Sequence, residues 1–353
     1  MEECKKYKTG REIADQYNAL EKTYRHIADK AEEIKSFFKA RQKAGWTFIG
    51  CGSGYTLCLA GAAVARMHAN KATFAIAAGD LLLNFPEHAD TIKDSVFIVP
   101  SRSGSTSEVL KCIELARHAY KTAIISICTR DNATLSAIAD LNISLPWAFD
   151  EATCQTRTVT NLYVAMMLVA AIVSEDKNLV DEITRAVSVG NSFIKAYGKP
   201  IADFTSRTAF SKVIVLADAE LEGIAREGML AFIEIARVPA NYFHVLDVRH
   251  GPVVLVDKET LIVMVGSPHN VALQADLVAD LKRTGAKVVV VSDQPEDTWK
   301  ADLHVAIPVY RSFCVRGIPF IYVVQELAYT AALKNGIDPD NPPGLKPSVI
   351  LRL

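Results

Sequence analysis

The strongest constraint on the fold is a pattern that occurs twice along the chain: short apolar runs rich in Val and Ile alternate with stretches of helical periodicity. The first series comprises WTFIG, ATFAIAA, SVFIVPS, TAIISI and LNISL. The second comprises KVIVLAD, NYFHVLD, TLIVMVG, KVVVVSD and LHVAI. Strands of this composition, separated by helices, are typical of parallel sheets buried on both faces. The sequence therefore predicts an α/β protein with five strands in each series.

The two series overlay with a nearly constant offset, which indicates an internal duplication. The offset falls from 166 to 162 residues over four strand pairs: Ile49 and Val215, Ile98 and Val263, Ile125 and Val289, Ile143 and Val305. Any α/β chain overlays on itself at some shift, but agreement of four strands within four residues favours two copies of one α/β unit. The predicted segments are a helical N-terminal segment (1–35), a first unit (36–190), a second unit (191–340) and a C-terminal tail (341–353).

The segments outside the strands are mostly helical. Residues 10–44 have apolar positions spaced for one packed face, and a long helix is expected at about 155–175, followed by a polar helical stretch at 176–208. The most apolar part, LYVAMMLVAAIV (162–173), is too short to span a bilayer and is predicted to be buried core. The Pro-rich tail IDPDNPPGLKPSVILRL is expected to wrap a surface or close a site.

Composition narrows the class of protein. The chain has 353 residues, 22% of them charged, and a formal net charge of -1, so it has no broad basic field for nucleic acid or an anionic membrane. Its seven scattered cysteines form no CxxC pair, which argues against a zinc site or a disulfide framework and for a reducing compartment. The start, MEECKKYKTGREIADQY, lacks the apolar region of a signal peptide. We expect a cytoplasmic protein.

The loop GCGSGYT (50–56) follows the first strand and precedes a helix. Its small residues, with Cys51, Gly52 and Ser53 at the centre, let the backbone approach a ligand, and the helix start offers free N–H groups. A dinucleotide fingerprint would need Gly where the chain has Tyr55, and no acid follows in ARMHANKATF. The loop therefore does not predict NAD binding.

The loop VPSRSGSTSEVLK (99–111) places hydroxyl residues around Gly104 before a second helix. A helix cap and a polar turn alone would explain a Ser-rich helix start. The alternative is a phosphate site, because hydroxyls donate to phosphate oxygens and the helix directs its positive end at the anion. The loop lacks the G-x-x-x-x-G-K-[ST] pattern of nucleotide-binding P-loops. Two such loops at neighbouring strand ends favour a bound phosphate monoester that is not transferred.

The second series has different chemistry. Its loop VGSPHNV has fewer hydroxyls, so no equivalent phosphate site is expected. A helix at about 219–237 carries Glu227 and Glu234 on one face, and the apolar surroundings of Glu234 would suit it to acid–base work, although a solvated glutamate is the simpler interpretation. RHGP places His250 before a Gly-Pro turn, where a loop-borne imidazole could act. The other histidines show no metal-ligand spacing and are expected to be structural.

Together these motifs resemble the sugar isomerase (SIS) domain family, over nearly the whole chain from about residue 36. The matching stretches are GCGSGYT, SRSGSTSE, EATCQTRTVTN, EGMLAFIE and DVRHGP. Their order is similar to that in the isomerase half of glucosamine-6-phosphate synthase, in tagatose-6-phosphate ketose/aldose isomerases and in fructosamine-6-phosphate deglycases. The resemblance implies two tandem SIS domains, each with a flavodoxin-like, mostly parallel five-stranded sheet flanked by helices.

The resemblance also implies roles for residues. Glu234 would move a proton between C1 and C2 of the sugar, and His250, often delivered by a neighbouring subunit, would open the ring. The residues implied to hold the sugar phosphate are Ser53, Ser101, Arg102, Ser103, Gly104, Ser105 and Thr106. Cys51, Gly52, Glu151 and Lys346 are further candidates for contact with the sugar. The family implies a homodimer or higher oligomer and needs no metal or organic cofactor.

Three positions depart from the synthase pattern. The synthase has Ser where this chain has Gly54 and Lys where it has Ala231, and its C-terminal active-site Lys aligns with Pro347, one position beyond Lys346. No glutaminase domain precedes the first strand, so glutamine-dependent synthesis is not expected.

The leading hypothesis is an isomerase, or isomerase and deaminase, for a 6-phosphorylated ketose, aldose or amino sugar. A fructosamine-6-phosphate deglycase is the alternative, because it can use the same Glu and His. A non-catalytic phosphosugar-binding regulator is the alternative of another class. Regulators that bind DNA carry a helix-turn-helix module, for which the N-terminal segment is too short.

Overall fold

The computed structural model describes residues 6–346, 349 and 351. Its contacts divide the chain into two compact units. The first unit comprises Asp15–Val187 with the tail from Lys346, and the second comprises Met1–Ala14 with Ser188–Leu345. Each unit has its own sheet and core.

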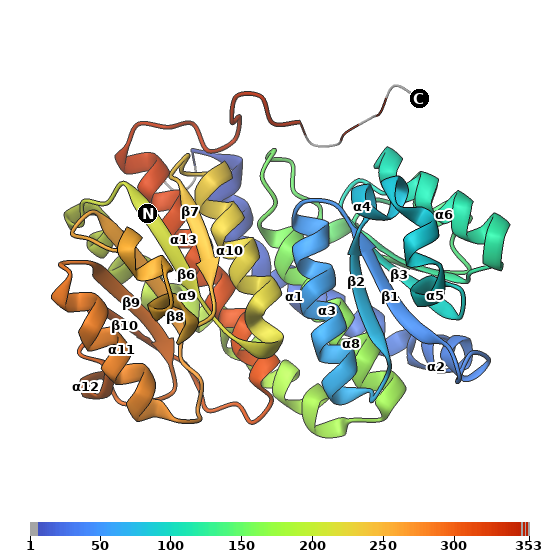
Figure 1. Ribbon diagram of the computed structural model, residues 1–353, viewed down its shortest axis with the longest axis horizontal. Coiled ribbons are helices and arrows are strands. Elements are labelled where there is room, and N and C mark those ends of the chain that lie inside the picture. Colours follow the sequence, from blue (N-terminus) through green and yellow to red (C-terminus); the bar gives the residue numbers. More distant parts are fainter. Residues whose placement is uncertain (1–5, 347–348, 350, 352–353) are drawn as a thin grey trace. The chain divides into compact units, whose positions relative to one another are not determined.

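The first unit is built on a five-stranded sheet in the order β2-β1-β3-β4-β5, with every neighbouring pair parallel (Figure 1). The strands are β1 (Gly45–Gly50), β2 (Thr73–Ala77), β3 (Ser95–Ser101), β4 (Ile124–Cys128) and β5 (Leu141–Ser144). All five residues of β4 and the first six of β3 are buried. The apolar runs in the sequence therefore correctly predicted a parallel sheet covered on both faces.

Helices cover both faces of this sheet. On one face, Ile113 of α6 packs with Phe97 and Val99 of β3; this layer consists of α4 (Ala78–Leu83), α5 (Ala89–Ile92) and α6 (Ser107–Tyr120). On the other face, Phe48 of β1 lies against Gly61 of α3; this layer consists of α2 (Ala31–Lys39), α3 (Ser53–His68) and α8 (Arg157–Ser174). The short α7 (Thr134–Ile138) follows β4, and α1 (Lys8–Asp29) precedes α2.

Helix α8 is the most apolar helix of the first unit. By length and composition alone its 18 residues could cross a membrane, but 78% of that stretch is buried inside the structure. The structure therefore agrees with the prediction of a core helix, although the helix is longer than the predicted apolar segment.

The second unit repeats the architecture. Its strands are β6 (Lys212–Leu216), β7 (Ala240–Phe243), β8 (Thr260–Val265), β9 (Lys287–Ser292) and β10 (Leu303–Ala306), all parallel in the order β10-β9-β8-β6-β7. Numbered within each unit, this order is the same as in the first sheet. The helices are α9 (Lys177–Arg207), which belongs to this unit from Ser188 onward, α10 (Glu222–Glu234), α11 (Val271–Arg283), α12 (Glu296–Trp299) and α13 (Gly317–Lys334). The duplication predicted from the strand offsets is confirmed.

Element boundaries differ from the predictions at two places. The helix expected at 219–237 is a 3₁₀ turn, Ala219–Leu221, followed by α10. The strand expected in NYFHVLD ends at Phe243. It ends early because Val245 donates its backbone N–H to the Asp218 carboxylate, 3.1 Å away, and so leaves the ladder.

Candidate functional site

The loops GCGSG and SRSGST lie at the point where the first sheet changes its winding direction. Strand β1 has β2 on one side and β3 on the other, so the connections that leave β1 and β3 run in opposite directions. In open α/β sheets, ligands bind in the crevice outside the carboxyl ends of the strands at such a switch point. The fold therefore brings together Cys51, Gly52 and Ser53 with the residues from Ser101 to Thr106 at one edge.

The first loop is compact where β1 meets α3. A Cβ on Gly50 would lie 2.5 Å from the backbone carbon of Gly54, and Gly52 has a φ of +54°. Ser53, the first residue of α3, is buried. Burial, with a smaller contribution from Glu108, raises the pKa of the half-buried Cys51 thiol to about 11. The thiol at the site is therefore protonated at neutral pH.

The second loop is a tight turn stabilised by its own hydroxyls. Gly104 donates its N–H to Ser101 Oγ at 2.9 Å, and Ser105 donates its N–H to Ser103 Oγ at 3.3 Å. Gly104 has a φ of +59°, and a Cβ there would lie 2.5 Å from Ala133 Cβ. In these bonds the serine oxygens act as acceptors, so their O–H groups remain available to donate to a ligand.

The start of α6 bears on the two interpretations of this Ser-rich loop. Thr106 is the N-cap residue, in an extended conformation, and its side chain makes no capping hydrogen bond. A loop selected only for capping would use this hydroxyl on the first-turn N–H groups. Other N-cap residues, such as Thr156 at α8, also make no such bond, so the phosphate site stays a prediction.

The tail reaches the same helix start. Ser107 donates its N–H to Val349 O at 3.4 Å, and Leu351 donates its N–H to Ser107 Oγ at 3.1 Å. The described part of the tail after residue 340 contains no helix or strand, and Lys346 in it is exposed. The expectation that the tail covers a surface agrees with these contacts. A role for Lys346 in the site stays a prediction.

Arg102 points into the protein from the second loop. Its side chain is buried, and Nη1 donates to the backbone oxygens of Ala152, at 2.9 Å, and Thr153, at 2.8 Å. The backbone oxygen of Arg102 accepts a hydrogen bond from Thr129 Oγ1 at 3.2 Å. The structure therefore connects the SRSGST loop to the segment 150–156, which contains Glu151.

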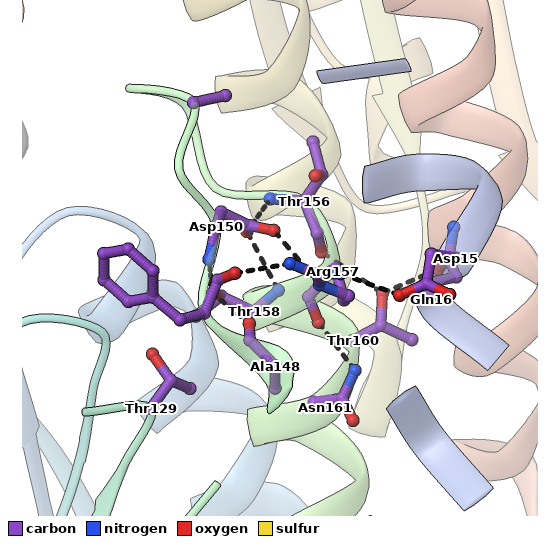
Figure 2. Close-up of polar contacts among 12 residues, drawn as sticks. Asp15, Gln16, Thr129, Ala148, Asp150, Thr156, Arg157, Thr158, Thr160 and Asn161 are labelled. Carbon is purple, nitrogen blue, oxygen red and sulfur yellow. Dashed lines mark hydrogen bonds and ion pairs between the residues drawn. The ribbon is translucent and has the colours of Figure 1, made fainter. Parts of the chain in front are cut away.

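Sequence reasoning missed Asp150, whose carboxylate organises this segment (Figure 2). Its Oδ2 accepts the backbone N–H groups of Thr156, at 2.7 Å, and Thr158, at 2.9 Å, and so caps the start of α8. Burial raises the pKa of the carboxyl, against these two bonds and the charges of Arg157 and Arg102, which lower it. An acid six residues before a helix is a weak sequence signal, because caps normally stand next to the first turn.

Arg157 ties the same segment to α1. Figure 2 shows its guanidinium between Asp15 and Asp150. Nη1 donates to Asp15 Oδ2 at 2.7 Å, and Nη2 donates to the backbone oxygen of Phe149 at 2.5 Å. A second bond to α1 joins Thr160 Oγ1 to Gln16 Oε1 at 2.8 Å. The segment 150–156 is thus held at both ends.

The proposed proton-transfer residues lie in the second unit. Glu234 is the last residue of α10 and is partly buried, whereas Glu227 on the same helix is fully buried. His250 is exposed and follows the turn Asp247–Arg249; its neighbour Arg249 pairs with Asp276, at 2.8 Å, and with Asp280. The catalytic roles of Glu234 and His250 stay predictions from the resemblance.

His244, which was expected to be structural, lies beside Asp218 at the carboxyl ends of β6 and β7. Its Nδ1 is 3.0 Å from Asp218 Oδ1 and 3.0 Å from Tyr242 Oη, and the imidazole is half exposed. No spacing rule could have found this pair, because 26 residues separate its members.

In the second unit, the loop after β8 is held by hydrogen bonds to a side chain of the same unit. After β8, the side chain of Gln274 accepts the N–H of Ser267 at 2.9 Å and donates to the backbone oxygens of Ser267 and His269. These bonds use polar groups that a phosphate would need. They are consistent with the expectation that this loop is no phosphate site.

The comparisons with known proteins agree with this geometry. The family model of the SIS domain matches residues 41–174 and 211–333. Among curated proteins, a probable glutamine–fructose-6-phosphate aminotransferase of Acanthamoeba polyphaga mimivirus is 24% identical over 96% of this chain and 57% of its own length. A putative D-galactosamine-6-phosphate deaminase of Escherichia coli is 24% identical over 78% of this chain and 75% of its own length. The chain spans about half the length of the aminotransferases it matches.

Solved structures show the same fold. Tagatose-6-phosphate ketose/aldose isomerase from Escherichia coli superposes with a TM-score of 0.86 at 21% identity, covering 99% of this chain and 97% of that one. Glucosamine-6-phosphate deaminase from Thermotoga maritima gives a TM-score of 0.81 at 25% identity, covering 98% and 100%.

Proposed function

Because the chain belongs to the SIS domain family, we propose that it is a phosphosugar isomerase that acts on a 6-phosphorylated ketose, aldose or amino sugar. The observation that carries the proposal is the convergence of GCGSG and SRSGST at the switch point of the first sheet, beside the start of α6. The similar ketose/aldose isomerase and amino-sugar phosphate deaminases support the substrate class.

The first unit would hold the phosphate. The hydroxyls of Ser101, Ser103, Ser105 and Thr106 donate to its oxygens, and the N-terminus of α6 stabilises its negative charge. A phosphate anchored in this way fixes the far end of the sugar, so that binding energy from the non-reacting end positions C1 and C2. The phosphate itself is not transferred.

Residues of the second unit, from this chain or from a partner subunit, would supply the proton chemistry. His250 opens the sugar ring by moving a proton between the ring oxygen and the anomeric hydroxyl. The carboxylate of Glu234 then takes the proton from the carbon next to the carbonyl, forming a cis-enediol or enolamine, and returns it to the other carbon. With an amino sugar the product is an imine at C2; water adds to that carbon and ammonia leaves, which yields the ketose phosphate.

The proposal is tested by following proton exchange at C1 and C2 by NMR in D₂O, together with ammonia release. The substrate panel comprises the 6-phosphates of tagatose, fructose, glucosamine and galactosamine and a fructosamine 6-phosphate. We expect isomerisation or deamination of at least one sugar. Turnover of the fructosamine 6-phosphate alone would identify a deglycase. Tight binding without any exchange would identify a regulator and overturn the proposal.

Glu234→Gln tests the base. We expect exchange to be abolished while the sugar phosphate still binds, because the amide keeps the shape of the side chain and cannot accept the proton. The matched control is Glu222→Gln on the same helix, whose carboxylate pairs with Arg226 at 2.8 Å. Exchange retained in Glu234→Gln would remove Glu234 from the mechanism.

A further inference from the structure

Resting on the proposed function, we propose that Arg102 is a positioning residue that ties two substrate loops together and does not contact the phosphate. The Arg102 side chain is buried. Nη1 carries two hydrogens, and both are used on the backbone oxygens of Ala152 and Thr153. These two donors are therefore not available to an anion.

The segment that Arg102 holds has one buried side and one accessible side. Ala152, Cys154 and Thr156 are buried, whereas Glu151 is exposed and Thr153 and Gln155 are partly exposed. Fixing the oxygens of residues 152 and 153 therefore fixes the direction in which Glu151, Thr153 and Gln155 project. These three side chains are the ones that would contact the sugar beyond its phosphate.

We call the bonds from Arg102 to the segment 150–156 the clamp, and Asp150 adds to it from within the segment. Its Oδ2 binds the N–H groups of Thr156 and Thr158, and it is close enough to Arg102 and Arg157 for their charges to lower its pKa against burial. Its Oδ1 is buried without a hydrogen bond, 3.8 Å from Arg157 Nε. The two arginines therefore compensate a buried carboxylate, so removing one of them disturbs the whole segment.

The second unit contains a comparable arginine bridge, although its guanidinium also pairs with the Asp293 carboxylate. There Arg316 is buried and donates to the backbone oxygens of Gly266, which follows β8, and Tyr310, which follows β10; both distances are 3.3 Å. Strands β8 and β10 correspond to β3 and β5. A guanidinium thus joins the same two regions in both units, from the loop after β3 in the first unit and from the segment after β10 in the second.

Arg102→Gln separates the two roles. If Arg102 is a positioning residue, its replacement should lower kcat/KM for the phosphosugar by about 100-fold, because small misplacements of substrate contacts have effects of this size. The inhibition constant of inorganic phosphate, which needs only the SRSGST loop, should stay nearly unchanged. A parallel loss of phosphate binding and kcat/KM would make Arg102 a direct ligand and overturn the proposal.

Hydrogen exchange gives a readout that does not depend on turnover. The amides of residues 151–158 should exchange faster in Arg102→Gln, and those of 109–120 in α6 should not. Unchanged exchange of the amides of residues 151–158 would overturn the proposal even if activity falls. If no substrate is turned over, the proposed function fails, while the exchange and phosphate measurements still decide on the clamp.

Two further variants control for folding and charge. Arg102→Lys keeps the charge on a shorter donor, so it should fold if the neutral variant does not; we expect partial retention of kcat/KM and intermediate exchange. Wild-type values for both measurements in this variant would contradict a geometric role. Arg117→Gln removes an arginine from the last turn of α6, where it pairs with Asp140 at 2.8 Å, and should leave exchange and kinetics unchanged.

Discussion

Asp293 and Arg316 form a nearly solvent-free ion pair in the second unit, with 2.9 Å between Oδ1 and Nη1 and 2.5 Å between Oδ2 and Nη2. The exposed fractions of the two side chains are 4% and 1%. Burial alone would raise the pKa of Asp293, but the hydrogen bonds from Arg316, supported by Gln294, lower it overall. Each of the two buried charges is thus compensated by the other.

Breaking this pair should destabilise the second unit. Asp293→Asn leaves the Arg316 charge buried, and we expect a loss of about 3–5 kcal/mol in the free energy of unfolding in urea. Because the folded pKa of Asp293 is lowered, the stabilisation is present above the unfolded pKa, near 3.8, and disappears as the pH falls through the folded value. Asp203→Asn, in the exposed pair with Lys199, should change stability by less than about 1 kcal/mol. Equal effects would contradict the buried-pair interpretation.

Glu326 on α13 should make the second unit less stable at neutral pH than in mild acid. Burial raises the pKa of this carboxyl from 4.5 to about 7. A raised folded pKa means that the stability is fully present below pH 4.5 and is lost as the pH rises towards 7, in total roughly 3 kcal/mol. Urea unfolding at pH 5 and pH 8 measures the loss, and Glu326→Gln should remove it. Glu114→Gln, at an exposed position, should leave the pH dependence as it is. An unchanged pH dependence in Glu326→Gln would assign the titration to another group.

Gly104→Ala should damage the phosphate loop. The new Cβ would lie 2.5 Å from Ala133 Cβ, at a φ of +59° that alanine disfavours. We expect a rise in KM for the phosphosugar and a stability loss of about 1–3 kcal/mol by thermal unfolding. Gly79→Ala in α4 meets no atom within 4 Å and should have little effect on either. A Gly104→Ala protein with wild-type KM would show that the turn is not needed for the substrate.

Ser103→Ala should weaken binding of the phosphate specifically. Losing one hydrogen bond to a charged group costs about 1.5–3 kcal/mol, so the inhibition constant of inorganic phosphate and the KM should both rise by roughly tenfold or more. Steady-state kinetics with phosphate as a competitor measures both constants. Ser36→Ala, on the exposed side of α2, is the matched control. Normal phosphate inhibition in Ser103→Ala would exclude its hydroxyl from the site.

The fold was predictable because the signals that determine it are local or repeated. Runs such as SVFIVPS and KVVVVSD are typical of buried strands, and the nearly constant offset between the two series indicates the duplication. The switch-point rule then places the loops after β1 and β3 together without any coordinates. For the same reason the candidate phosphate loops could be located from the sequence.

The directions of polar side chains were not predictable. Arg102 turns inward because two backbone oxygens 50 and 51 residues away accept its hydrogens, and a motif contains no information about such partners. Asp150 caps α8 from six residues before its N-cap, and His244 meets Asp218 across a helix and a strand. Each of these arrangements depends on how distant segments fold against one another.

The internal hydrogen bonds of the loops after β8 and β9 determine how the second unit could be redesigned. Duplication gave the protein two sheets of the same strand order, and in the second the Gln274 side chain and the Asp293–Arg316 pair bond the loops internally. A sugar-phosphate site like the one proposed for the first unit could therefore be engineered in the second without building a new scaffold. It would require removal of this internal bonding after β8, hydroxyl residues in its place, and a compensating gain in stability elsewhere in the unit. The second unit thus already has the strand order on which such a site would be built.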